Sequence, residues 1–205
     1  MLKTTSKPYL LAIVVTASYL HAIGAAASQT RLAQASTILA GCVSESTPSR
    51  QRIDDCTRLN NEVPAALREN ACSARGHAYR DAGDNDHAVG DYTKALDLQP
   101  RDKEALYASG YVLHDKGTFD QAIADYNAAI AIDGTDRDIF YSRALSNQAK
   151  GDLEHAIADY TTVIGFKPSF ANAYHNRGVA YRQKGDAPSA GKDEMEYQRL
   201  RGKGG

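Results

Sequence analysis

The chain has 205 residues, of which 42% are hydrophobic and 24% are charged, and its formal net charge at pH 7 is −1. This composition is typical of a globular chain that can bury its own core, so it excludes an extensively disordered protein and a polytopic membrane protein. Basic and acidic residues balance, and the chain therefore lacks the concentrated positive charge that nucleic-acid binding needs. We expect no nucleic-acid partner.

The first 27 residues have the pattern of a secretory signal peptide. Lys3 and Lys7 precede an apolar run that reaches Ala27, and small residues at Ala25 and Ala27 offer a cleavage site. The run is short for a membrane-spanning helix, which needs about 20 apolar residues. We predict export to the periplasm or beyond, with no membrane span after cleavage. An uncleaved anchor and a later cut after Ala35 are the alternatives.

Residues 39–42, which end in Cys42, match a lipobox, the sequence at which bacterial lipoproteins are cut and acylated. A lipobox directly follows the apolar run of its signal, whereas polar residues separate this one from Ala27. Lipid anchoring at Cys42 is therefore an alternative and not the first expectation.

The three cysteines are Cys42, Cys56 and Cys72. An exported protein meets oxidising conditions, which favour a disulfide. Cys42 and Cys56 are 14 residues apart with a turn-like segment between them, and closing a loop of about 15 residues stabilises a fold by about 3 kcal/mol. We predict the Cys42–Cys56 disulfide and leave a Cys56–Cys72 pair open. Cys72 then serves as a buried, inert thiol.

Residues 28–68 are predicted to form a helical cap that carries this disulfide. Thr47-Pro48 starts a helix that runs to about Asn60, because Pro suits the first helical position. Pro64 starts a second helix that continues into the segment downstream. Residues 28–46 show no clear period.

Two sets of small residues recur every 34 residues in the rest of the chain. They are Gly83, Gly117, Gly151 and Gly185, and Ala88, Ala122, Ala156 and Ala190. A 34-residue period predicts stacked helix–turn–helix units that bury their apolar faces against one another. The four units are 69–102, 103–136, 137–170 and 171–205.

Each unit is predicted to form two antiparallel helices. The first helices are 70–82, 104–116, 138–150 and 172–184. Each ends at the recurring Gly, which tolerates the left-handed conformation past a helix end. The next residues, which are Asp84, Thr118, Asp152 and Asp186, are predicted to cap the second helices, and Thr118 with Gln121 makes a capping box.

The second helices carry the predicted core. Tyr92, Tyr126 and Tyr160 occupy the same position in successive units, at helical spacing from small apolar residues, so we predict that they are buried. The fourth unit has Glu194 at this position. Its polar second helix is expected to close the stack with an outer face in water.

Residues 69–204 resemble tetratricopeptide repeats (TPRs), with Ala-Ile-Ala-Asp-Tyr at 122–126 and 156–160 and Tyr-His-Asn-Arg-Gly at 174–178. The resemblance implies an all-α fold, a right-handed superhelical solenoid of antiparallel helix pairs with four repeats and the N-terminal helical cap. The chain is also similar to small exported TPR proteins of alphaproteobacteria, in which an Ile-x-x-Cys-Thr stretch, here 53–57, precedes the repeats.

The resemblance implies that the first helices line a concave groove that holds a peptide segment or a partner protein. The side chains mapped to it are His77, Tyr107, Tyr111, His114, Tyr141, His175, Asn176 and Arg182. Tyr107, Tyr111 and Tyr141 are the expected anchors, because tyrosine offers a large contact area and a hydrogen bond at low entropic cost. The alternative is a solvated groove without a ligand.

No catalytic residues, metal site or cofactor is predicted. His77 and His114 could approach each other, but no Cys or carboxylate completes a metal-ligand spacing. We predict a non-enzymatic adaptor of the bacterial envelope. A lipid-anchored envelope-assembly factor and, more remotely, a hydrolase or transferase are the other classes.

Overall fold

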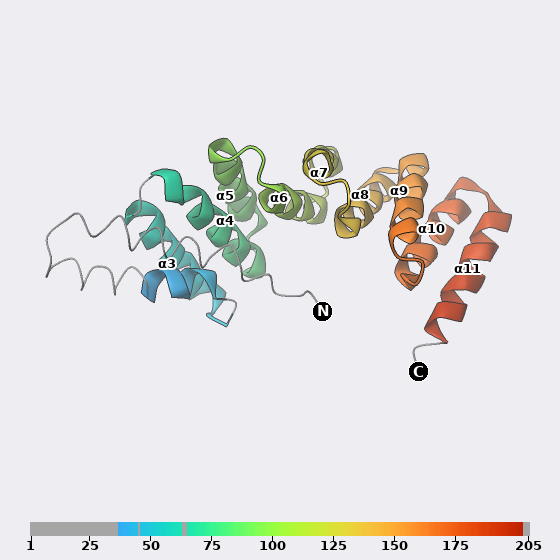
Figure 1. The fold of residues 1–205 in the computed structure, drawn as a ribbon, viewed down its shortest axis with the longest axis horizontal. Coiled ribbons are helices and arrows are strands. Elements are labelled where there is room, and N and C mark those ends of the chain that lie inside the picture. Colours follow the sequence, from blue (N-terminus) through green and yellow to red (C-terminus); the bar gives the residue numbers. More distant parts are fainter. Residues whose placement is uncertain (1–36, 45, 63–64, 203–205) are drawn as a thin grey trace, which may run out of the picture. The chain divides into compact units, whose positions relative to one another are not determined.

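A computed structural model of the chain describes residues 37–44, 46–62 and 65–202. The predicted signal peptide and both of its cleavage sites lie outside these residues. Within the described ranges all regular structure is helical and no strand occurs, which confirms the all-α solenoid (Figure 1). None of the described helices combines the length and the apolar character that crossing a bilayer needs. The chain divides into two compact units, one ending at Gln99 and one beginning at Pro100.

The first unit holds the cap and the first repeat. A helix over residues 37–43, which the sequence pattern does not predict, is followed by α3 (Ser49–Glu62), α4 (Ala65–Asp81) and α5 (Asn85–Leu98). α3 packs on α4, and α4 packs on α5. α3 and α4 match the two predicted helices of the cap, and α4 continues into the first repeat as predicted.

The cap is closed by the predicted disulfide. Cys42 and Cys56 are bonded with their Cα atoms 4.8 Å apart, and both are completely buried. Cys72 is buried and takes no part in the disulfide, so the alternative pairing of Cys56 with Cys72 is wrong. Ile38, Leu59 and small residues of α4 surround the disulfide in one apolar cluster.

The second unit consists of three helix pairs in sequence order. The helices are α6 (Lys103–Asp115), α7 (Phe119–Ile132), α8 (Arg137–Lys150), α9 (Leu153–Phe166), α10 (Ala171–Lys184) and α11 (Ala187–Arg201). Each helix packs on the next one in the chain, and α6 also touches α8. First helices therefore follow one another along the stack, as in a solenoid.

Within each repeat the two helices are joined by the same turn. The recurring Gly residues have φ between 76° and 90°, a conformation that only glycine adopts without strain. In the third repeat the amide of Gly151 donates to the carbonyl of Gln148, and the amide of Asp152 donates to that of Asn147. This is a Schellman motif, which satisfies the last carbonyls of the first helix. The other three turns repeat both bonds.

Capping of the second helices agrees with the prediction in three repeats and differs in one. Asp84, Asp152 and Asp186 accept hydrogen bonds from amides in the first turn of the helices that they cap. Thr118 makes no such bond. Its hydroxyl instead donates to the carbonyl of Leu113 at 2.9 Å. The predicted capping box with Gln121 is therefore wrong, because the hydroxyl serves the end of α6 rather than the start of α7.

The predicted core tyrosines are completely buried. Tyr92, Tyr126 and Tyr160 each have 0% exposure. In the second repeat a Cβ added to Gly110 would lie 2.7 Å from Cε1 of Tyr126, so only glycine allows α6 and α7 to approach this closely around the ring. The polar α11 buries little besides Ala190 and leaves Met195 67% exposed, as expected of a terminal helix.

Three of the four repeats also contain an arginine–aspartate fork that joins their two helices. In each fork the guanidinium donates two hydrogen bonds of 2.6–2.8 Å to one carboxylate. The pairs are Arg75–Asp91, Arg143–Asp159 and Arg177–Asp193. All three carboxylates are buried, so the bidentate bonds compensate for the cost of removing charge from water.

Candidate partner-binding surface

The predicted binding residues of the second unit lie on its first helices, α6, α8 and α10. We call them the first-helix row. The row comprises Tyr107, Tyr111, His114, Tyr141, His175, Asn176 and Arg182.

Hydrogen bonds between successive first helices involve Tyr107, Tyr141 and Asn176 of the row. The hydroxyl of Tyr107 on α6 lies 3.4 Å from Oγ of Ser142 on α8. The side-chain amide of Asn176 on α10 donates to the hydroxyl of Tyr141 on α8 at 2.7 Å. Because these bonds join residues about one repeat apart, they hold neighbouring first helices side by side along the row.

Members of the row differ in their exposure. Tyr111 is 44% exposed, and His175 and Arg182 are exposed as well, while Tyr107 and Tyr141 are half-buried. Burial raises the pKa of both Tyr107 and Tyr141, so their hydroxyls stay protonated at neutral pH. The row thus contains one exposed aromatic ring, that of Tyr111, and two half-buried rings whose neutral hydroxyls are hydrogen-bonded.

One aromatic residue beside the row does not follow from the sequence pattern. Phe170 precedes α10, and its ring lies in a T-shaped arrangement with that of Tyr141, with the centroids 5.2 Å apart. The guanidinium carbon of Arg137 lies 5.0 Å from the centroid of the Phe170 ring. Phe170 stands at the N-cap position of α10, where α6 and α8 have the aspartates Asp102 and Asp136. This replacement of an aspartate by an aromatic residue is the signal in the sequence that could have identified Phe170. Phe170 closes one side of Tyr141 with apolar surface.

Tyr126 lies beneath the row, with its ring 6.1 Å from that of Tyr107. Its hydroxyl is buried and finds no hydrogen-bond partner of good geometry in the described part of the chain. In contrast, the hydroxyl of Tyr92 meets Nδ1 of His77 at 2.9 Å, and that of Tyr160 donates to Gln148 at 2.9 Å. Burial raises the pKa of Tyr126, so this hydroxyl remains a neutral donor.

The two histidines considered as a metal pair have separate partners. His77 is in the first unit, where it binds Tyr92. His114 is in the second unit, and its Nδ1 lies 2.8 Å from Oγ of Ser146. In the residues that the structure describes, no group of three or more potential ligands could hold a metal ion. We therefore assign both histidines to packing between helices. The ring of His175 lies 4.8 Å from that of Tyr197 of α11, tilted by 42°.

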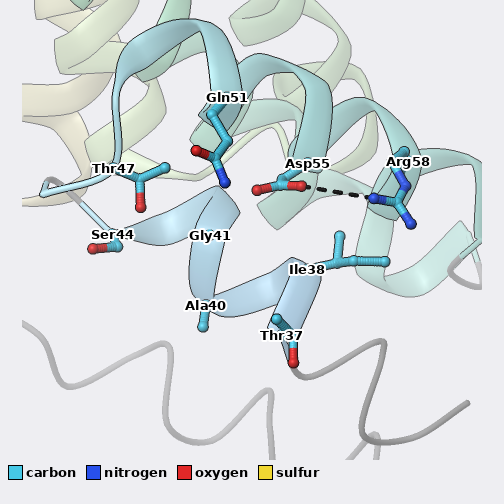
Figure 2. A pocket seen from close by; sticks show the side chains of 9 residues that line it. All are labelled: Thr37, Ile38, Ala40, Gly41, Ser44, Thr47, Gln51, Asp55 and Arg58. Atoms are coloured by element: carbon cyan, nitrogen blue, oxygen red, sulfur yellow. Dashed lines mark ion pairs between the residues drawn. The ribbon is translucent and has the colours of Figure 1, made fainter. Parts of the chain in front are cut away.

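A hollow of about 620 Å³ lies in the first unit between the helix over residues 37–43 and α3 (Figure 2). Gln51 and Asp55 face Gly41 across it, and Arg58 pairs with Asp55 at 4.0 Å. A side chain at Gly41 would overlap the Asp55 carboxylate, so glycine lets the short helix sit this close to α3. The lining includes apolar residues such as Ile38 and Ala40 and only one weak ion pair, so the hollow holds no arrangement of side chains that suits catalysis.

Comparisons with known proteins agree with this architecture. The family profile "Tetratricopeptide repeat" matches residues 73–137, and the profile "TPR repeat" matches residues 148–185, which together amount to half of the chain. A search of curated protein sequences gave no match.

Several solved structures share the fold. A crystal structure of MamA superimposes with a TM-score of 0.72 at 24% identity, over 76% of this chain and 90% of that one. MamA from Desulfovibrio magneticus RS-1, residues 41 to the end, gives a TM-score of 0.77 at 19% identity, over 83% and 95% of the two chains. At these identities the likeness establishes the fold alone. Together with the two profile matches, the repeated turns and the helix pairs, it shows that the chain belongs to the tetratricopeptide repeat family.

Proposed function

We propose that this protein is a non-enzymatic interaction scaffold that holds an extended segment of a partner protein against the first-helix row. The observation that supports this most is the combination of the exposed Tyr111 with the half-buried Tyr107 and Tyr141, whose hydroxyls are already hydrogen-bonded. Rigid tyrosines supply contact area at low entropic cost.

The decisive experiment compares partner capture by the wild type and by Tyr111→Ala, using crosslinking and affinity purification from the envelope fraction. Phe166→Ala is the matched control, because Phe166 on α9 is 46% exposed against 44% for Tyr111. We expect Tyr111→Ala to lose the partner while Phe166→Ala keeps it, with unchanged circular dichroism in both. If Tyr111→Ala keeps every partner, the row is not the binding surface.

We further propose that the protein works outside the cytoplasm, in the periplasm. The apolar N-terminal run supports export, and the Cys42–Cys56 disulfide is of a kind that persists in oxidising compartments. Cell fractionation followed by N-terminal sequencing tests this and separates cleavage after Ala27 from cleavage after Ala35. Full-length protein in the cytosol would contradict it.

The lipid-anchored alternative requires a thioether on the sulfur of Cys42. In the structure that sulfur is bonded to Cys56, and one sulfur cannot carry both bonds. We therefore favour the unacylated form. Mass spectrometry of the mature protein distinguishes the two, because diacylglycerol on Cys42 would be incompatible with the disulfide.

A further inference from the structure

The second repeat lacks the arginine of the fork but keeps the aspartate. The residues one period away from Arg75 and Asp91 are Ser109 and Asp125. Ser109 is 3% exposed, and its hydroxyl acts on the Asp125 carboxyl by lowering its pKa, against the larger effect of burial. In the part of the chain that the structure describes, no cationic side chain pairs with Asp125.

The complete forks show what this position normally accommodates. Besides its two bonds to the carboxylate, each guanidinium donates a third one to a residue on an earlier helix, as Arg143 does to Asn127 at 2.6 Å and Arg177 does to Thr161 at 2.9 Å. The side chains of these two arginines remain 21% and 15% exposed. Each arginine side chain, that of Arg75 being 12% exposed, therefore keeps a minor part of its surface in solvent while its guanidinium binds a buried carboxylate.

Because position 109 holds a serine instead of an arginine, Asp125 is half-buried with no counter-charge among the residues that the structure describes. Burial is the main influence on its carboxyl group and raises its pKa. Asp120, on the same helix, is by contrast 80% exposed and paired with Lys150 at 2.5 Å. A cation that binds next to Asp125 would therefore stabilise its ionised carboxylate. In each of the other three repeats the equivalent carboxylate binds a guanidinium.

We propose that Asp125 and Ser109 form a receptor for an arginine side chain of a partner protein. The occupant is a guanidinium rather than an ammonium, because the planar fork matches both oxygens of a carboxylate at once and is more weakly hydrated. Neither residue belongs to the first-helix row, so this contact is independent of the proposed segment-binding function and would fix the position of a partner at a second point.

The test uses the full chain and a defined probe, the acetylated and amidated tripeptide Ala-Arg-Ala, with the citrulline tripeptide as its uncharged isostere. Binding is followed by NMR through the carboxyl carbon of Asp125. We expect that carbon to titrate at lower pH with the arginine probe present, and the citrulline probe to leave its titration unchanged.

Three variants locate the contact. Asp125→Asn removes the acceptor, and Ser109→Arg fills the site with the arginine that the other repeats carry. We expect both to weaken binding of the arginine probe by at least about tenfold. Asp120→Asn, which removes a charge from the same helix, should leave binding unchanged.

The proposal is overturned if Ser109→Arg or Asp125→Asn binds the probe as the wild type does, or if the citrulline tripeptide binds equally well. Should Asp125→Asn fail to fold, Ser109→Arg decides alone, because it keeps the carboxylate and restores the fork of the other repeats. A lysine tripeptide that binds as tightly as the arginine tripeptide would also refute the preference for a guanidinium.

Discussion

The hydroxyl of Tyr160 donates a hydrogen bond of 2.9 Å to Oε1 of Gln148, whereas the equivalent hydroxyl of Tyr126 has no such partner in the described residues. The same buried ring thus occurs with and without a satisfied hydroxyl. Tyr160→Phe should destabilise the fold by about 0.5–1.5 kcal/mol, the net value of a hydrogen bond. Tyr126→Phe should be neutral or stabilising, because a buried unpaired hydroxyl is itself unfavourable. Urea unfolding of both variants measures the difference, and equal losses would contradict the assignment.

Glycine at position 110 is predicted to be required by packing rather than by the backbone. Gly110→Ala places a methyl group 2.7 Å from the ring of Tyr126 and should cost about 1–3 kcal/mol through repacking. Gly90, in the middle of α5, has nothing within 4 Å of an added Cβ. Gly90→Ala should therefore stabilise its helix by about 0.5–1 kcal/mol. Thermal unfolding of the pair checks the opposite signs, and a loss in Gly90→Ala would be inconsistent with them.

Reduction of the disulfide should weaken the cap. Without the Cys42–Cys56 bond, the unfolded chain regains loop entropy worth about 3 kcal/mol. We expect the backbone amides of α3 to exchange their hydrogens faster in the presence of reductant, which hydrogen-exchange measurements detect. Thiol labelling of the unreduced protein should modify a single cysteine, Cys72, and only after unfolding. Three reactive thiols would refute the disulfide.

Two aspartates of the second unit should affect stability with opposite dependence on pH. Burial raises the pKa of Asp125 above its ordinary value of 3.8, so its ionised form destabilises the fold as pH rises through the raised value. Asp125→Asn should therefore be more stable than the wild type at neutral pH and lose this advantage below about pH 3.8.

Asp133 is the counterpart with a lowered pKa. Hydrogen bonds from Thr135 and then from Lys103 lower it, so its contribution to stability is present above the ordinary value and is lost as pH falls through the lowered one. Asp133→Asn should be less stable than the wild type at neutral pH, and the two should converge in acid. Urea unfolding between pH 2 and 7 follows both variants. A parallel response of the two would contradict the assigned directions.

The hairpins were predictable because local signals agree with the period. Glycine past the first helix, aspartate before the second and tyrosine at a fixed position each depend on a few neighbouring residues. Thr118 escaped prediction for a physical reason: its hydroxyl can donate to a preceding carbonyl as well as accept from a following amide. The choice of Leu113 as its partner depends on the turn that the chain has already formed.

The candidate surface was predictable only in part. Position in the repeat placed Tyr107 and Tyr141 on first helices, but their hydrogen bonds to Ser142 and Asn176 depend on how neighbouring repeats pack. The forks, by contrast, could have been found in the sequence, because arginine and aspartate recur 16 residues apart in three repeats. Only a comparison with this pattern shows that Ser109 replaces the arginine of the fork.

The ring of Tyr141 is held from three directions, by the amide of Asn176, the edge of Phe170 and the ring of Tyr160 at 5.8 Å. These contacts therefore fix the rotamer of Tyr141 before any ligand binds. A peptide that binds across this ring loses its own conformational entropy, but the side chain of Tyr141 has little left to lose. Even a short segment with few contacts could therefore bind.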